Sequence, residues 1–415
     1  MKNGRVLLSA YACEPGLGSE AGIGWNWTRQ VAQQYDTWLI TRENNVEQIE
    51  RAAREEGIDN LTVVGFDLPP WARFWKRGAL GAMPYFYLWQ VAMGGAARKL
   101  DAQFDFDVVH HLTFASSWIP SGLATLDKPF VWGPVGQHPR IPDRFLLRED
   151  WRARALEFFK AGLRGTLMAC DPLVRRTRME ADRILSLGSE FSDRVQGATR
   201  HKLQPCLACG TDPHHLSESR FLRSKEFRVL YAGRLVDLKG VRLVIESFAR
   251  LVERKPEAQL DLLGEGPRRA WIEQRVKELG LEHAITLHGK VTHDRTLDCM
   301  HRSDVFLFPS FEGAGMVVPE AMAAGNPVVC LDFGGPGEMV GSERGLRVQV
   351  AESPEATAAG LASALLLLAD NEEQRERLAR SAANWASTET TWAAKGELLP
   401  QIYGQALAHH QARKS

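Results

Sequence analysis

Two cations follow one expected strand at a spacing that suits a diphosphate. The apolar run Val229–Ala232 predicts a strand, and Gly233-Arg234 comes directly after it, with Lys239-Gly240 opening the next helix. The arginine fork can bind two oxygens, lysine adds a point charge, and a helix N-terminus adds backbone donors. A solvated pair of basic loop residues is the plainer alternative.

Two carboxylates further along the chain could bind sugar hydroxyls. Glu312 follows the expected strand Val305–Pro309, and Glu320 lies about two turns into the next helix. Ionised carboxylates accept hydrogen bonds from vicinal hydroxyls such as those of ribose and hexose. Gly315 lies between them, where backbone amides at a helix start could reach a phosphate or a hydroxyl.

These residues belong to a chain that reads as two α/β halves. Apolar runs alternate with helical stretches such as Glu20–Tyr35 and Gly240–Lys255, which predicts parallel sheets with crossover helices. Open parallel sheets bind ligands at the carboxyl ends of their strands, so two such domains would face each other across a cleft. The expected strands are Arg5–Ala10, Thr37–Thr41, Leu61–Phe66, Val108–His110 and Phe130–Trp132, then Phe227–Ala232, Gln259–Leu263, Ile285–His288, Val305–Pro309 and Pro327–Leu331.

A polar break containing Pro205, Gly210 and Pro213 separates the two halves. We expect an N-terminal domain over residues 1–212, a linker over 213–226 and a C-terminal domain over 227–387. The segment from Thr391 to Tyr403 reads as helical, and we expect a terminal helix at about 388–410 that belongs with the N-terminal domain.

The ordered motifs of the second half resemble the donor domain of retaining GT-B glycosyltransferases of the family 4 (group 1) type. The coarse layout of the remaining chain agrees, so the resemblance covers most of the protein. It implies an α/β GT-B fold, with two Rossmann-like parallel-sheet domains facing a central cleft and a C-terminal helix crossing back to the N-terminal domain. The matching pieces are Gly233-Arg234, Lys239-Gly240, Gly264-Glu265-Gly266-Pro267, Phe311-Glu312-Gly313-x-Gly315, Glu320, Ala321–Val329 and Gly334–Glu338.

The resemblance implies a role for individual residues. Arg234 and Lys239 would hold the donor diphosphate, Glu320 the ribose, and Glu312 would face the transferred hexose. The donor would be a UDP- or GDP-linked sugar, which the sequence does not distinguish, and neither a cofactor nor a metal is implied. The further donor-binding positions are Gly16, Gly18, Gly233, Gly264, Gly266, Val291, Gly315, Met316 and Val317, and those on the acceptor side are Ser19, Glu20 and Gly136.

Two adjacent histidines end a strand of the first half, in Asp107-Val-Val-His110-His111. The family often has two histidines separated by one residue here, with one near the reacting sugar, whereas this chain has Leu112 at the second position. Neighbouring strand residues point to opposite faces, so we expect one of the two to serve the site. Both His110 and His111 stay candidates.

The expected mechanism follows from the residues present. Double displacement would need a nucleophilic carboxylate, and the matching loops offer no evident candidate because Glu312 is committed to sugar hydroxyls. The resemblance implies front-face attack with retention, in which the departing phosphate takes the acceptor proton. Positioning and electrostatic stabilisation of the leaving group would then carry catalysis, without a metal. The expected catalytic residues are Arg234, Lys239, Glu312 and one of the histidines.

Charge is unevenly distributed along the chain. The 415 residues carry 51 Lys/Arg and 51 Asp/Glu, which argues against a nucleic-acid binder. Residues 71–183 nevertheless contain 17 basic and 11 acidic residues, with six of the twelve tryptophans. Such a region suits an anionic membrane surface, and an amphipathic helix with a solvated face is the alternative. The uncharged stretch Gly78–Ala97 is long enough to span a bilayer, but its glycines and Pro84 favour a partly buried helix, with a lipid-contacting surface as the second reading.

Compartment signals are sparse. Six cysteines are too few for a disulfide framework, and the Cys206/Cys209 pair lacks a second pair for zinc. The apolar run Val6–Ser9 is too short for a signal peptide. We expect a cytoplasmic protein, with peripheral attachment at the inner face of the cytoplasmic membrane as a further expectation.

These features favour a hexosyltransferase acting on a glycan acceptor in bacterial exopolysaccharide, lipopolysaccharide or related glycoconjugate assembly, with a lipid-linked acceptor as the working hypothesis. The same fold acting on a soluble small molecule or sugar phosphate is one alternative. A non-catalytic sugar-nucleotide-binding scaffold is another, although Arg234, Lys239, Glu312 and Glu320 together argue against it. A dinucleotide oxidoreductase is disfavoured because the glycines after Gly16 do not fit the Gly-x-Gly-x-x-Gly spacing.

Overall fold

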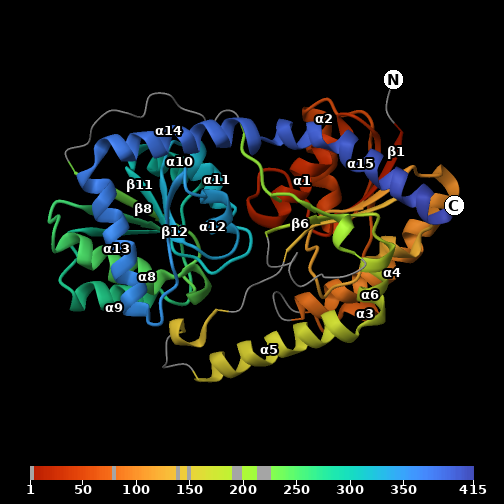
Figure 1. The fold of residues 1–415 in the computed structure, drawn as a ribbon. Helices are drawn as coiled ribbons and strands as arrows, with labels where there is room; N and C mark the ends of the chain where they lie inside the picture. The colour runs from red at the N-terminus through yellow and green to blue at the C-terminus, as the bar shows by residue number, and fades with distance from the viewer. Residues whose placement is uncertain (1–3, 77–80, 137–140, 147–150, 189–198, 213–225) are drawn as a thin grey trace. The chain divides into compact units, whose positions relative to one another are not determined.

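A computed structural model of the chain describes residues 4–76, 81–136, 141–146, 151–188, 199–212 and 226–415. The chain forms two compact units (Figure 1). Unit 1 consists of Met1–Gln137, Phe158–Ala208 and Trp392–Ser415, and unit 2 consists of His138–Glu157 and Cys209–Thr391. The predicted linker at 213–226 lies outside the described residues except for its last position.

A parallel sheet organises unit 1. Its seven strands in the described part have the order β3-β2-β1-β4-β5-β6-β7, and all neighbours run parallel. The chain order reverses between β1 and β4, which is the kind of switch point where open α/β sheets bind ligands. The strands are β1 (Arg5–Ser9), β2 (Asp36–Thr41), β3 (Leu61–Gly65), β4 (Val108–His111), β5 (Phe130–Val135), β6 (Arg183–Ser186) and β7 (Leu203–Pro205).

Helices cover this sheet and close its core. Tyr85, Phe86, Trp89 and Met93 of α4 are buried against β1 and β4 residues such as Leu7 and Val109. The helices are α1 (Ser19–Ala32), α2 (Val46–Glu55), α3 (Pro70–Arg73), α4 (Ala82–Phe104), α5 (Trp151–Cys170, which begins in unit 2), α6 (Pro172–Glu180) and α15 (Trp392–Lys414).

Unit 2 repeats the architecture. Its described strands form a parallel sheet of six in the order β10-β9-β8-β11-β12-β13. The strands are β8 (Arg228–Ala232), β9 (Gln259–Leu263), β10 (Ile285–Gly289), β11 (Val305–Phe308), β12 (Val328–Leu331) and β13 (Gly345–Val348). The helices are α8 (Val241–Val252), α9 (Arg269–Glu278), α10 (His293–Arg302), α11 (Val317–Ala323), α12 (Gly334–Val340), α13 (Pro354–Asp370) and α14 (Glu372–Glu389).

Amphipathic spacing explains why unit 2 folds locally as it does. Val241, Val244, Ile245 and Phe248 recur at helical spacing, and all four are buried on α8. In Figure 1, α8, α9 and α13 lie toward one side of the sheet, and α10, α11 and α12 lie toward the other. A parallel sheet buried on both faces needs helices on both sides, which matches its apolar strands.

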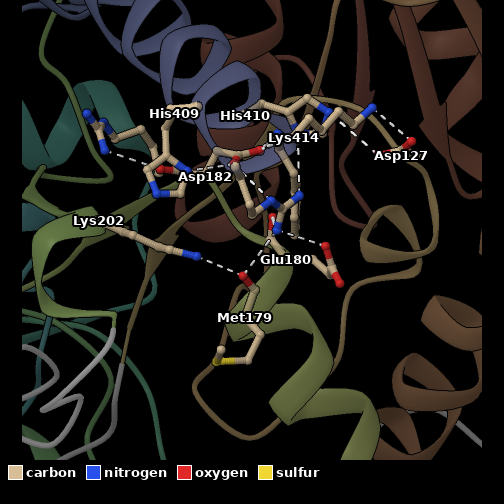
Figure 2. Close-up of polar contacts among 12 residues, drawn as sticks. Asp127, Met179, Glu180, Asp182, Lys202, His409, His410 and Lys414 are labelled. Atoms are coloured by element: carbon tan, nitrogen blue, oxygen red, sulfur yellow. Dashed lines mark hydrogen bonds and ion pairs between the residues drawn. The ribbon is translucent and has the colours of Figure 1, made fainter.

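Polar contacts hold the terminal helix α15 in unit 1, and those to Asp182 centre on a buried carboxylate (Figure 2). Asp182, just before β6, is fully buried and accepts hydrogen bonds from Nδ1 of His409 at 2.8 Å and of His410 at 3.1 Å. The same carboxylate accepts the backbone N–H of Phe130 at 3.0 Å. Nearer the end of the helix, Lys414 pairs with Asp127 at 2.8 Å. One buried carboxylate therefore links α15 to the first residue of β5.

The uncharged stretch Gly78–Ala97 lies partly outside the described residues, and from Ala82 onward it belongs to α4. Seven residues of α4 are buried, including Tyr85, Trp89 and Ala97. None of the helices in the described ranges is long and apolar enough to cross a bilayer.

Candidate functional site

The candidate residues of unit 2 gather at the carboxyl end of its sheet. Gly233 and Arg234 directly follow β8, and the short 3-10 turn Asp237–Lys239 leads into α8. Gly264 directly follows β9, and Glu312 lies in the loop after β11. Because the strands are parallel and adjacent, the fold brings these loops to one edge.

The closest contact among them joins Lys239 and Glu312. The lysine Nζ donates to Oε2 of the carboxylate, and it also lies 4.9 Å from the centre of the Phe308 ring. Both side chains are largely buried, at 17% and 14% exposed. The other oxygen of Glu312, Oε1, is buried and has no hydrogen-bond partner among the described residues. A buried acceptor without a donor lowers the stability of the fold, and a ligand hydroxyl that donates to this oxygen would remove that penalty.

Arg234 has a different environment. Its side chain is exposed, and it forms no ion pair with any residue that the structure describes. Its backbone carbonyl accepts a hydrogen bond from the buried Tyr231 hydroxyl at 3.1 Å, which fixes the loop. Next to it, Arg268 binds Asp237 through two nitrogens, so this second arginine is committed to the protein. Arg234 is therefore free to bind an anion.

Glycine is required at two positions of these loops. Gly264 has φ +137°, and a Cβ there would overlap the carbonyl oxygen of Gly233. Gly315 has φ +63°, and a Cβ there would lie 2.8 Å from a ring carbon of Pro336. The glycines thus let the loops after β8, β9 and β11 pack closely, and Gly266 similarly lies against the carbonyl of Leu235.

Glu320 lies on α11, and Met316 and Val317 are at the start of that helix. Burial raises the pKa of Glu320, nearby His293 opposes the shift, and nearby Asp212 adds to it. The predicted nucleobase contact, Val291, lies between β10 and α10, also beyond a strand's carboxyl end.

In unit 1, the glycine-rich loop precedes α1. Gly16 has φ +72°, Gly18 is the N-cap of α1, and a Cβ at either would meet open space. Ser19 and Glu20 begin the helix. The Glu20 carboxylate turns inward and accepts the backbone N–H of Phe114 at 3.0 Å, and burial raises its pKa. Phe114 has φ +53°, so Glu20 holds a left-handed backbone turn after β4.

The two histidines are both fully buried at the end of β4. His110 contacts the Tyr403 hydroxyl at 3.0 Å and the Gly133 carbonyl at 2.8 Å, so both of its ring nitrogens have partners. His111 contacts the Thr113 carbonyl at 3.0 Å through Nε2, while its Nδ1 lacks a partner among the described residues. Burial lowers the pKa of His110 to about 3 and that of His111 to about 4. His110 is committed to the link with α15, and His111 keeps one nitrogen available.

Gly136, on the acceptor side of the prediction, follows β5 and donates its N–H to the Ala115 carbonyl at 2.9 Å. A polar cluster at the ends of β1, β2 and β3, which contains Arg42 and Lys76, is absent from the sequence prediction. Arg42 directly follows β2, and a cation after a strand is the one sequence signal that points to it. Within the described ranges, no three His, Cys, Asp or Glu side chains are grouped as a metal site would require.

Comparisons with known proteins relate the chain to glycosyltransferases. Residues 215–385 match the family model described as Glycosyl transferases group 1. The chain is 28% identical over 277 residues to an alpha-D-kanosaminyltransferase from Streptomyces kanamyceticus, covering 65% of this chain and 67% of the relative. It is 26% identical over 351 residues to a D-inositol 3-phosphate glycosyltransferase from Paenarthrobacter aurescens, covering 76% and 82% respectively. Of several further curated relatives it spans less than half the length.

Among solved structures, the Anabaena Alr3699/HepE protein in complex with UDP is similar with a TM-score of 0.65 and 15% identity, covering 97% of this chain and 100% of that one. Likeness at this identity concerns the fold. The predicted class, an α/β GT-B fold with two Rossmann-like parallel-sheet domains, is confirmed.

Proposed function

We propose that this chain, which carries a group 1 glycosyltransferase domain at residues 215–385, transfers a hexosyl group from a nucleotide-diphosphate sugar to a glycan acceptor. The observation that carries the proposal is the Lys239–Glu312 pair at the carboxyl end of the unit 2 sheet, with one buried carboxylate oxygen still unpaired. A sugar hydroxyl would satisfy that oxygen, and the exposed Arg234 would bind the diphosphate.

The proposed reaction is of the family 4 type and retains configuration. The acceptor hydroxyl attacks the anomeric carbon on the same face of the sugar from which the leaving group departs. The bond between that carbon and the phosphate oxygen breaks, and the departing phosphate takes the proton of the acceptor hydroxyl. Arg234 and Lys239 neutralise the charge that develops on the diphosphate. Glu312 orients the hexose, and Glu320 accepts from the ribose hydroxyls. Because these cations supply the neutralisation, no metal is needed.

The remaining predicted residues complete the proposal. Backbone amides of Gly315, Met316 and Val317 contact the sugar or phosphate, Val291 lies near a uracil or guanine base, and the loop of Gly16 and Gly18 approaches the donor and the acceptor. Of the two histidines we favour His111 for a site role, because its Nδ1 is unpaired while both nitrogens of His110 are used.

We further propose a lipid-linked acceptor and peripheral attachment to an anionic membrane at the cytoplasmic face. The support is a set of exposed aromatic and aliphatic side chains on helices of unit 1, within the basic region 71–183. Amphipathic basic surfaces of this kind bind anionic lipid. The members are Trp71 on α3, Phe74 directly after that helix, Leu88 and Val91 on α4, and Phe158, Phe159 and Leu163 on α5.

The function is tested in two steps. A thermal-shift screen of UDP-, GDP- and ADP-sugars identifies the donor, and transfer is then followed with lipid-linked and soluble acceptors in the presence of EDTA. Arg234→Ala is expected to lower turnover at least about a hundredfold while the melting temperature stays unchanged, because Arg234 is exposed and unpaired. Arg254→Ala, an exposed arginine after α8, is the matched control. Unchanged turnover in the Arg234 variant would refute its role, and transfer only to a free sugar or sugar phosphate would replace the lipid-linked acceptor.

A further inference from the structure

A cluster of charged and aromatic side chains occupies the carboxyl ends of β1, β2 and β3 in unit 1. We call it the Lys76 cluster, and it consists of Tyr11, Arg42, Asp67, Arg73 and Lys76. Tyr11 comes two residues after β1, Arg42 comes directly after β2, and Asp67 comes two residues after β3. These positions lie at the edge where parallel α/β sheets bind ligands, near the switch between β1 and β4.

Asp67 is the anchor of the cluster. Its side chain is only 2% exposed and accepts the Tyr85 hydroxyl at 2.6 Å. Arg42 reaches the carboxylate through Nε at 3.3 Å, and Arg73 through Nη1 at 3.6 Å. Each arginine thus offers Asp67 only one of its nitrogens, and an arginine has five N–H donors in a planar fork. Several donors on Arg42 and Arg73 remain for another acceptor.

Lys76 is held beside this anchor without a carboxylate partner among the described residues. Its Nζ donates to the Tyr11 hydroxyl at 3.3 Å and lies 4.3 Å from the centre of the Tyr85 ring. Burial and the nearby charge of Arg42 lower the pKa of this ammonium, while Asp67 opposes the shift. An ammonium held against aromatic rings and next to other cations gains from a nearby anion.

The local charge balance points the same way. Three cations, Arg42, Arg73 and Lys76, surround the buried Asp67 carboxylate, and the other carboxylate in reach is the exposed Glu43, 3.6 Å from Arg73. The described side chains of the cluster and Glu43 therefore carry one excess positive charge. The donors come from the loops after β1 and β2, from Arg73 at the end of α3, and from Lys76 just after that helix. Donors that converge from several directions suit a tetrahedral oxyanion better than a planar carboxylate, since a phosphoryl group presents three oxygens.

We propose that the Lys76 cluster binds a phosphoryl group of the acceptor. This inference rests on the proposed glycosyl transfer, and it assigns the acceptor a chemical class: a molecule that carries a phosphate near the hydroxyl to be glycosylated. Trp71 on α3 is 78% exposed, and Phe74, which directly follows Arg73 and the end of α3, is 77% exposed. A phosphate belonging to a lipid headgroup or to a free sugar phosphate would meet the same cations.

The test uses the full chain with its donor site saturated by the nucleotide that the thermal-shift screen identifies. The phosphate probe then cannot bind to the donor site. Glycerol 3-phosphate is titrated calorimetrically, and vesicles of phosphatidylcholine with phosphatidic acid are co-sedimented against phosphatidylcholine alone. Lys76→Gln removes the unpaired cation and leaves the Asp67 anchor intact. Lys76→Arg restores the charge, and Lys99→Gln removes an exposed charge from α4 as the matched control.

Lys76→Gln is expected to weaken binding of one phosphate probe at least about tenfold, because a hydrogen-bonded charge contact is lost. Lys76→Arg should recover most of the affinity, and Lys99→Gln should match the wild type. Preference for vesicles would identify a lipid headgroup, and preference for glycerol 3-phosphate a soluble acceptor. Equal binding by Lys76→Gln and Lys99→Gln, or no binding of either probe by the wild type, would overturn the proposal. If no nucleotide binds in the screen, the proposed function fails while the titration still reports on Lys76.

Discussion

The Lys239–Glu312 pair shows how one contact can serve both stability and ligand binding. Lys239 satisfies one carboxylate oxygen, and the second is left buried and unpaired. Such a group costs stability in the empty protein and is retained where it binds something. The motif spacing predicts both residues but not their pairing, because they are 73 positions apart and only the β8–β11 neighbourhood brings them together.

Removing one partner of this pair should cost more stability than removing both. Lys239→Met leaves the Glu312 carboxylate buried and unpaired, so we expect unit 2 to lose about 1–3 kcal/mol of unfolding free energy. Lys239→Met/Glu312→Gln removes the unpaired charge and should recover most of that loss, whereas transfer stays impaired in both variants. Urea unfolding and donor turnover measure the two effects. A double variant as unstable as the single one would contradict this account of the pair.

The buried histidines predict a loss of stability in acid. His110 and His111 have their pKa lowered to about 3 and about 4, so the folded state keeps them neutral. Unfolded histidine titrates near 6.5, and below that pH the unfolded chain therefore binds protons that the folded chain refuses. Stability should be complete above about pH 6.5 and should fall by about 1.4 kcal/mol per pH unit for each histidine down to about pH 4. Urea unfolding from pH 7.5 to 4.5 measures the slope, which His111→Gln should lower by about one proton. An unchanged slope would show that His111 does not contribute.

At the scale of elements, periodic apolar runs made most of the fold predictable. The predicted bounds of β9 are those observed, and the predicted bounds of β1 and α8 lie close to the observed ones, because each of these elements buries a regular apolar pattern. Strands β6, β7 and β13 escape prediction. Strand β7 (Leu203–Pro205) has three residues, and β13 (Gly345–Val348) contains the exposed Arg347. Neither strand therefore carries an apolar run long enough to be recognised.

Only part of the candidate site could be predicted from the sequence. The loops with ordered glycine and glutamate motifs were predictable, because the spacing of these motifs can be read from the sequence without knowledge of contacts. The Lys76 cluster was not, since Tyr11 and Lys76 are separated by 65 positions and no motif joins them. The commitment of His110 to Tyr403 was equally hidden, because it depends on where α15 docks.

The docking of α15 should depend on one carboxylate. Asp182 accepts from His409, His410 and the Phe130 backbone at once, and an amide has a single acceptor oxygen. Asp182→Asn should therefore leave a buried donor unpaired and destabilise unit 1 by about 2–4 kcal/mol. Hydrogen exchange along α15 should rise first. Asp127→Asn, at an exposed ion pair with Lys414, is the control and should change stability by less than about 1 kcal/mol. Equal effects from the two substitutions would rule out Asp182 as the anchor.

For the whole molecule, the neutral total conceals a division of charge. The basic excess lies in residues 71–183, while the remaining chain has an acidic excess that nevertheless contains Arg234 and Lys239. Net charge therefore says little about binding of the proposed donor or acceptor. The positions of individual charged side chains determine binding, because exposed charges more than about 10 Å apart are largely screened from each other at ordinary ionic strength.

The exposed aromatics of unit 1 offer the last test. Phe158 and Phe159 on α5 are 65% and 66% exposed. Transfer of such rings from water into a lipid interface is favourable, because their apolar surface is removed from water. The variant Trp71→Ser/Phe74→Ser/Phe158→Ser/Phe159→Ser should lose at least about tenfold in affinity for vesicles containing phosphatidylglycerol, because each ring contributes on the order of 1 kcal/mol or more. Its melting temperature should be unchanged, since these side chains lie outside the core. Co-sedimentation at low and high salt measures the loss. Leu367→Ser, at an exposed position on α13 of unit 2, is the control for hydrophobicity alone, and equal binding by both variants would separate this surface from the membrane.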